Sequence, residues 1–265
     1  MKISYKLTTV AAALMLSLGA NAGVIDTFST AQGLLTDNTA NGIGLSSSVT
    51  TLGTDILGGE RDIFVSLLST GGNAFANAAI GVGAGALSFS VSAQASGTGT
   101  VQWDGIDNSI ALNTTGLGGV SLIADGSTAF RVDTLFSDLG YRFDIEAYTN
   151  ATTFTKISFL AHAANSLTTS FIPFSGFTNA GLCGFSDPTG TIIPGVTSIS
   201  CGAGGNVNFA SLGALQLIID PLGGTTSVDL TLDSVTTVPE PGVLALMGLG
   251  LMAAGFAGRR RKSQS

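Results

Sequence analysis

The sequence is poor in charged residues, histidine and cysteine. Of its 265 residues only 10% are charged, and it has one histidine, two cysteines and one tryptophan. A structural zinc site needs four good ligands, so we expect none. Between the terminal segments, residues 23–237 carry four Lys or Arg against sixteen Asp or Glu, a net charge of −12. Such a surface repels phosphate backbones, so we expect no nucleic-acid partner.

The sequence also lacks any motif typical of a catalytic site. His162 has no neighbouring acid or hydroxyl that would define a triad, and we interpret it as a structural residue. The glycine-rich run at residues 81–85 lacks the Lys-Ser/Thr of a phosphate-binding loop. A glycosidase needs two carboxyl groups about 5–9.5 Å apart, and sixteen acids do not by themselves identify such a pair. We therefore predict no catalytic residue and a non-enzymatic protein.

Both cysteines lie in a Gly/Pro-rich region. Cys183 and Cys201 have 17 residues between them, and in an oxidising compartment they can pair. In the chain-entropy model a bridge across such a loop stabilises the fold by about 3 kcal/mol. We predict a structural disulfide, with a catalytic thiol as the alternative.

The amino-terminal segment has the three parts of a secretory signal peptide. Lys2 and Lys6 precede an apolar stretch from residue 7 to residue 18, and Ala20 and Ala22 form a small-x-small cleavage site. We expect cleavage after Ala22, and a retained amino-terminal membrane anchor is the alternative.

The last stretch combines three elements in a fixed order. Pro239, Glu240 and Pro241 form a rigid, helix-incompatible triplet. An uncharged apolar run follows at residues 242–258, long enough for a helix of roughly 25 Å that just spans a bilayer. Next come Arg259, Arg260, Arg261 and Lys262, which the positive-inside rule keeps in the cytoplasm. The preceding domain is therefore expected outside the cytoplasm.

This order of Pro-Glu-Pro, apolar span and Arg cluster closely resembles the PEP-CTERM sorting signal of bacterial exported proteins. The resemblance covers about the last 28 residues. It implies an exosortase-type membrane protease as partner, with the transmembrane helix removed after sorting. The same tail has also been labelled a C-terminal domain of ice-binding proteins, and this label implies nothing about ice.

The chain thus divides into four predicted parts. Residues 1–22 are a signal peptide, residues 23–237 an exported domain, residues 238–262 the sorting signal and residues 263–265 a short tail. The exported part is large enough for one domain with a real core.

The exported domain reads as short strands separated by glycine-rich turns. Apolar and polar residues alternate around Phe89, Ile145 and Leu230, which is typical of strands with one wet face. No long helical period is evident. We therefore predict an all-β, antiparallel, jelly-roll-like β-sandwich, with a β-solenoid as the alternative, although no fixed repeat is present. Further expected strands are residues 63–68, 100–103, 120–124, 129–136, 153–160 and 212–219, and residues 23–28 are a candidate edge strand.

One turn carries the best candidate for a ligand site. Asp104, Asp107 and Asn108 follow Trp103; their hard oxygens could hold Ca²⁺, and the tryptophan could stack on a sugar. The spacing does not match an EF-hand loop. The alternative, which we favour, is an Asx/Gly turn beside a core tryptophan.

Two groups of charged residues lie in or next to expected strands. Glu60, Arg61 and Asp62 precede one expected strand, and Arg131 and Asp133 share the polar face of another. We interpret them as surface pairs across the sheet, each worth less than about 1 kcal/mol.

Two functions remain open. The first is a non-enzymatic protein of the cell surface or extracellular matrix, membrane-anchored before processing, whose β-sandwich serves adhesion, scaffolding or weak carbohydrate binding. The second is a hydrolase of extracellular polysaccharide on the same sandwich. The lack of a nucleophile motif favours the first.

Overall fold

The computed structural model describes residues 23–51 and 54–239. The predicted signal peptide and cleavage residues Ala20 and Ala22 lie outside the described residues. So does the transmembrane run at residues 242–258, together with the basic cluster. Within the part that is described, no helix is long and apolar enough to cross a membrane.

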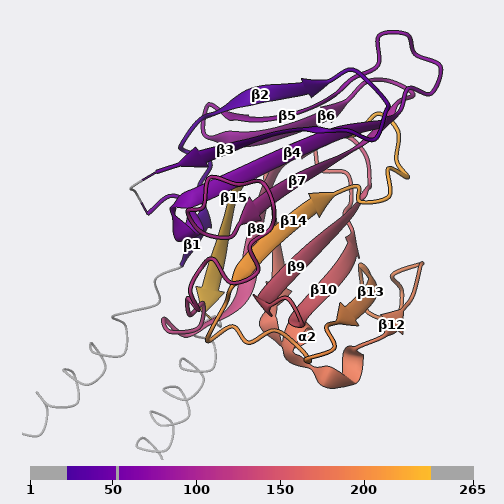
Figure 1. Cartoon of the computed structure of the whole chain (residues 1–265). Coiled ribbons are helices and arrows are strands. Elements are labelled where there is room, and N and C mark those ends of the chain that lie inside the picture. Colours follow the sequence, from indigo (N-terminus) through magenta and orange to yellow (C-terminus); the bar gives the residue numbers. More distant parts are fainter. Residues whose placement is uncertain (1–22, 52–53, 240–265) are drawn as a thin grey trace, which may run out of the picture.

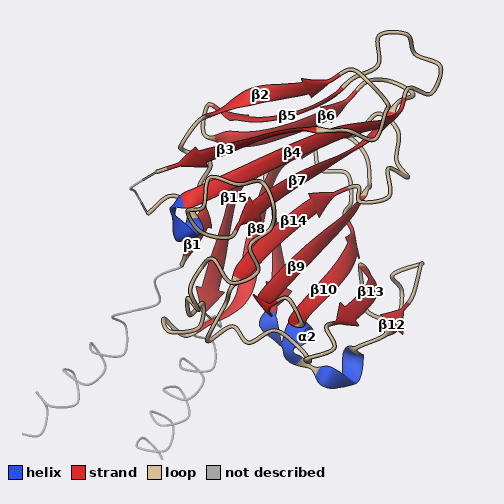
Figure 2. Cartoon of the chain, viewed as in Figure 1, coloured by secondary structure: helices blue, strands red, loops and turns tan. Residues whose placement is uncertain are grey.

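The described chain forms two antiparallel sheets that face each other (Figures 1 and 2). One sheet has seven strands in the order β11-β8-β15-β6-β5-β2, with β1 also pairing with β15; the other has eight strands in the order β12-β13-β10-β9-β14-β7-β4-β3. The described pairings are antiparallel throughout. The predicted jelly-roll-like β-sandwich is therefore confirmed.

The strands of the seven-stranded sheet are β1 (Val24–Asp26), β2 (Gln32–Asp37), β5 (Ala78–Gly83), β6 (Ala86–Val91), β8 (Ser127–Ser137), β11 (Thr168–Pro173) and β15 (Asp229–Pro239). Those of the eight-stranded sheet are β3 (Leu45–Thr50), β4 (Glu60–Ser69), β7 (Ser96–Trp103), β9 (Arg142–Asn150), β10 (Thr153–Leu160), β12 (Phe185–Ser186), β13 (Val196–Cys201) and β14 (Ala214–Ile219). Short helical turns occur at η1 (Leu57–Gly59), α2 (Phe174–Thr178) and η2 (Ala180–Leu182).

One expected strand is absent. Residues 120–124 make only an isolated bridge, between Val120 and Leu212. Glycines on both sides let the segment run as a loop, so apolar content alone misled the prediction. The candidate edge strand at residues 23–28 is present as the short β1.

The core lies between the sheets and is filled by large inward side chains. Phe89 of β6 packs against Gly99 of β7, where an added Cβ would come within 2.8 Å of the phenylalanine ring. A glycine here therefore lets the two sheets approach closely. Towards α2, Phe130, Phe174 and Phe209 form an aromatic cluster, with 4.1 Å between the stacked rings of Phe174 and Phe209.

A fully buried ion pair ties the amino terminus to the eight-stranded sheet. Arg61 Nη1 lies 3.0 Å from Asp26 Oδ1, and both side chains are 0% exposed. Arg61 also donates to Gln32 and to the carbonyl of Thr30, while Trp103 Nε1 donates to Asp26 Oδ2 at 2.8 Å. The expected surface role of Arg61 is therefore wrong, and so is that of Glu60 and Asp62, which are buried as well. By contrast, Arg131 and Asp133 form a partly exposed ion pair, although it lies along β8 and not across the sheet.

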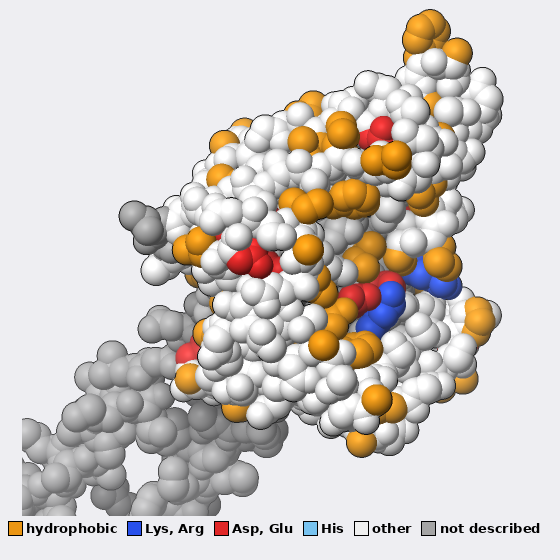
Figure 3. Space-filling model, in the orientation of Figure 1, with side chains coloured by type: hydrophobic (Ala, Val, Ile, Leu, Met, Phe, Trp, Pro, Cys, Tyr) orange, Lys and Arg blue, Asp and Glu red, His pale blue; other side chains and the backbone are white. Residues whose placement is uncertain are grey.

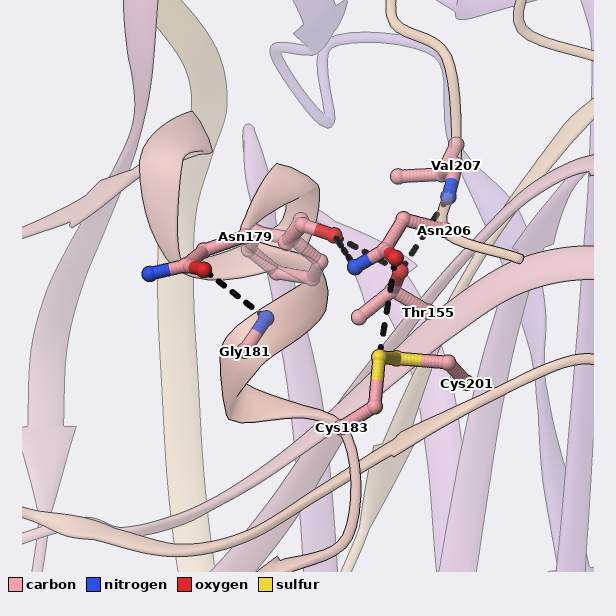
Figure 4. Close-up of a disulfide and its surroundings, with 8 residues drawn as sticks. Thr155, Asn179, Gly181, Cys183, Cys201, Asn206 and Val207 are labelled. Atoms are coloured by element: carbon pink, nitrogen blue, oxygen red, sulfur yellow. Dashed lines mark hydrogen bonds between the residues drawn. A yellow bond between two sulfur atoms is a disulfide. The ribbon is translucent and has the colours of Figure 1, made fainter.

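The predicted disulfide between Cys183 and Cys201 is confirmed, with 5.5 Å between their Cα atoms (Figure 4). It joins the turn after η2 to the end of β13. Beside it, Asn206 Nδ2 donates to the carbonyl of Phe177, which also accepts from Thr155 Oγ1. The bridge and these bonds hold the loops around α2 against the eight-stranded sheet.

Candidate functional site

Polar side chains from seven strands form one row across the eight-stranded sheet. The strand register places each beside the next, and alternate residues of a strand share a face. Neighbours in the chain such as Ile63, Val101 and Ile145 are buried in the core, so the row lies on the outer face. We call these residues the polar row: Ser48, Asp62, Gln102, Gln216, Glu146, Lys156 and Ser200.

Hydrogen bonds connect the middle of the polar row. Gln102 Nε2 donates to Gln216 Oε1 at 2.5 Å, and Gln216 Nε2 donates to Glu146 Oε2 at 3.2 Å. Tyr148 donates its hydroxyl to the same carboxylate oxygen at 2.6 Å. Burial, and then the bond to Glu146 and its charge, raise the pKa of Tyr148, so the hydroxyl stays a donor. These contacts fix both amides in one orientation, with Gln102 still half-buried and open to solvent.

One lysine forms ion pairs with two carboxylates at the β9–β10 end of the row. Lys156 Nζ lies 2.5 Å from Asp144 Oδ2 and 3.0 Å from Glu146 Oε1. Burial alone would lower the pKa of Lys156, but its hydrogen bonds to these two acids raise it. Asp144 Oδ1 keeps no partner among the described residues. This end of the row is therefore rich in charge, and Lys156 offsets one of the two negative charges.

Half-buried aromatic rings flank the polar row on both sides. Phe64 lies on β4, two residues beyond Asp62. On the other side, the rings of Tyr148 and Phe154 lie 5.2 Å apart on β9 and β10. Figure 3 shows basic and acidic side chains meeting in a hollow on this face, with hydrophobic side chains around it. Planar polar groups beside apolar rings can hydrogen-bond and stack at once.

The turn predicted as a ligand site separates into two parts. Asp107 and Asn108 are exposed, and Asp107 Oδ1 accepts from the amide of Ser109 at 2.9 Å, as in an ordinary Asx turn. Asp104 is buried and lies on the outer face near Glu60 and Asp62. In the described ranges, no group of three or more His, Cys, Asp or Glu side chains is arranged to hold a metal ion.

Trp103 cannot stack on a sugar. Its side chain is 1% exposed and points into the core, where Nε1 donates to Asp26. The expected alternative, a core tryptophan beside a turn, is therefore the correct one. The aromatic rings available to a ligand on the outer face belong instead to Phe64, Tyr148 and Phe154.

An apolar cavity of about 450 Å³ opens elsewhere, between the two sheets beside β11. Tyr141, Phe143, Phe159 and Phe171 line it, together with His162. His162 is exposed in the loop after β10, and its interpretation as a structural residue stays a prediction.

Comparison with known proteins identifies the carboxyl-terminal segment. Residues 237–262 match the PEP-CTERM protein-sorting motif. The chain carries a PEP-CTERM sorting signal. Such a signal implies an exported protein. The match begins at Thr237, inside β15, and this strand ends at Pro239. Glu240, Pro241, Arg259, Arg260 and Arg261 lie outside the described residues.

Similar folds occur among solved structures, at low sequence identity. "Structure of PfGH50B" aligns with 62% of this chain and 22% of its own, at 10% identity and a TM-score of 0.41. A family 11 carbohydrate-binding module of the cellulosomal cellulase Lic26A-Cel5E of Clostridium thermocellum aligns over 83% and 95%, at 12% identity and a TM-score of 0.38. The same type of module in complex with a β-1,3-1,4-mixed-linked tetrasaccharide aligns with 79% of this chain and 98% of its own, at 12% identity and a TM-score of 0.34. The chain thus spans about a fifth of PfGH50B, and no function is inferred from these values. No match was found among curated proteins.

Proposed function

We propose that the exported domain is a non-enzymatic binding module of the cell surface or extracellular matrix, which holds polysaccharide weakly on the outer face of its eight-stranded sheet. The observation that carries the proposal is the polar row with aromatic rings on both sides. Amides and a carboxylate fixed by mutual bonds suit sugar hydroxyls, and half-buried rings suit the apolar faces of pyranose rings. A net charge of −12 in residues 23–237 favours neutral over acidic polysaccharide.

The arrangement of the acids speaks against the hydrolase alternative. Asp144 and Glu146 lie together at the β9–β10 end of the row, and Lys156 binds both. A glycosidase needs one of its two carboxyl groups protonated as general acid. Both carboxylates here are bound by the same ammonium group, so we propose no catalysis at this pair.

We also propose that an exosortase-type membrane protease handles the sorting signal, so that anchoring in the membrane is temporary. The match at residues 237–262 supports this partner. The sandwich would then reach the cell surface or the extracellular polymer layer, where adhesion or scaffolding through polysaccharide is possible.

Binding can be tested by polysaccharide pull-down and a glycan array with the exported protein. Gln102→Ala removes one amide from the row, and losing one hydrogen bond, about 0.5–1.5 kcal/mol, weakens binding roughly 2- to 12-fold. Phe64→Ala removes a flanking ring. The matched control is Gln94→Ala, which truncates an exposed glutamine in the β6–β7 turn and leaves binding unchanged.

Three outcomes distinguish the possibilities. Reduced polysaccharide binding by Gln102→Ala and by Phe64→Ala, with unchanged binding by Gln94→Ala, supports the proposal. Binding to no polysaccharide, or equal binding by all variants, refutes it. Release of reducing ends by the wild-type protein would establish the hydrolase instead.

A further inference from the structure

Three carboxylates are buried together where the polar row reaches β4 and β7. Glu60 and Asp104 are 0% exposed and Asp62 is 2% exposed. The register pairs Asp62 with Gln102, so Asp104, two residues further along, shares the outer face with Glu60 and Asp62. The cluster could not be recognised in the sequence, because Glu60 and Asp62 precede Asp104 by some forty residues.

Four oxygen atoms of these side chains have no hydrogen-bond partner within residues 23–51 and 54–239. They are both carboxylate oxygens of Asp62, Oε1 of Glu60 and Oδ1 of Asp104. Ser48 lies opposite Asp62 in the register of β3 and β4, yet makes no well-formed hydrogen bond to its carboxylate. Buried polar atoms are almost always hydrogen-bonded, so four orphan oxygens in one place indicate a missing partner.

Main-chain amides donate hydrogen bonds to two of the three carboxylates. Glu60 Oε2 accepts from the amides of Asp107 and Asn108, at 3.1 and 3.3 Å. Asp104 Oδ2 accepts from the amide of Asn113 at 2.6 Å. Each of these two acids therefore has one oxygen fixed and the other one free.

No described cation compensates the cluster. Buried charges that lack a partner are costly. The described cations act on other acids: Arg61 on Asp26, Arg131 on Asp133, Lys156 on Asp144 and Glu146, and Arg142 on Asp220.

We infer that Asp62 and Asp104 bind a Ca²⁺ ion, with Glu60 beside it. The donors are all hard oxygens, and Ca²⁺ accepts six to eight of them, including water and main-chain carbonyls, in flexible geometry. Asp62 lies on β4 and Asp104 directly follows the neighbouring strand β7, so one ion can contact both. Because no three such side chains in the described ranges already surround one point, water and main-chain oxygens complete the site. Of the three residues expected from the turn, only Asp104 is retained as a ligand.

This inference does not depend on polysaccharide binding. Its first test uses the wild-type exported protein after chelator treatment. Extracellular modules bind Ca²⁺ with a Kd of about 10⁻⁴–10⁻³ M, so about 10 mM CaCl₂ raises Tm by roughly 3–10 °C over the chelated protein. An unchanged Tm overturns the inference.

Variants locate the ion. Asp62→Asn and Asp104→Asn keep the side-chain shape and relieve repulsion within the cluster, and each is expected to abolish the Ca²⁺-induced rise in Tm. Asp233→Asn removes the same charge from β15 on the other sheet and is expected to keep that rise. A shift retained by both cluster variants shows that the ion binds elsewhere and overturns the assignment.

A luminescence measurement covers the case in which the variants do not fold. Trp103 is the only tryptophan of the chain and directly precedes Asp104. Tb³⁺, which replaces Ca²⁺ in oxygen sites, is expected to emit when this tryptophan is excited, and excess Ca²⁺ is expected to quench that emission by displacement. Absence of sensitised emission from folded wild-type protein overturns the inference.

Discussion

The buried pair of Arg61 and Asp26 gives the sharpest prediction about stability. Asp26→Asn removes the charge and replaces one acceptor oxygen by an NH₂ group. That group would face donors only, because Arg61 Nη1 reaches both carboxylate oxygens, at 3.0 and 3.1 Å, and Trp103 Nε1 reaches one of them. Arg61 would stay charged and fully buried without an anion.

Removing one partner of a buried ion pair costs about 3–5 kcal/mol. For a domain of 150–250 residues this lowers Tm by roughly 6–20 °C. Urea unfolding followed by the fluorescence of Trp103 measures the loss. The control is Arg131→Ala, whose partner is Asp133 and whose side chain is 41% exposed; its expected cost is at most about 1 kcal/mol.

A double replacement tests the physical cause. In Asp26→Leu with Arg61→Met, both charges are replaced by apolar groups, so the double variant should unfold less easily than either single variant. A loss below about 1 kcal/mol for Asp26→Asn, or strictly additive losses, would refute the idea that an uncompensated buried charge is responsible.

Two further predictions concern acid stability and processing. Hydrogen bonds from the amide of Ile192 and from Thr189 lower the pKa of Asp187 to about 2, so its stabilising contribution is present above about pH 3.8 and is lost as pH falls towards 2. Thermal unfolding between pH 5 and 2 should show a smaller acid-induced drop in Asp187→Asn than in wild type; equal drops contradict the assignment. For processing, intact-mass analysis of exported protein should place the terminus near Pro239 and Pro241, and recovery only of protein that keeps residues 259–262 would contradict it.

The architecture could be predicted because apolar and polar residues alternate along strands that have one face in the core and one in solvent. Ile145 and Leu230 belong to such strands, and both were placed correctly. Strand β5 was missed, since five of its six residues are buried and no alternation remains. Strand β3 is rich in serine and resembles a loop in composition.

The candidate sites could not be predicted in the same way. The polar row joins residues from Ser48 to Ser200 through the register of seven strands, and no local pattern records that register. Arg61 was misplaced because its neighbours Glu60 and Asp62 do point outward. Its own side chain points inward to Asp26, and only the pairing of the folded strands shows the difference.

The position of β15 has a consequence for the order of events during export. This strand lies between β8 and β6 and also pairs with β1, yet it is the last described strand and ends at the first proline of the sorting triplet. The seven-stranded sheet therefore stays open until the final strand has been translocated. Under the proposed processing, a protease acting at the triplet would therefore meet the end of the strand that completes this sheet.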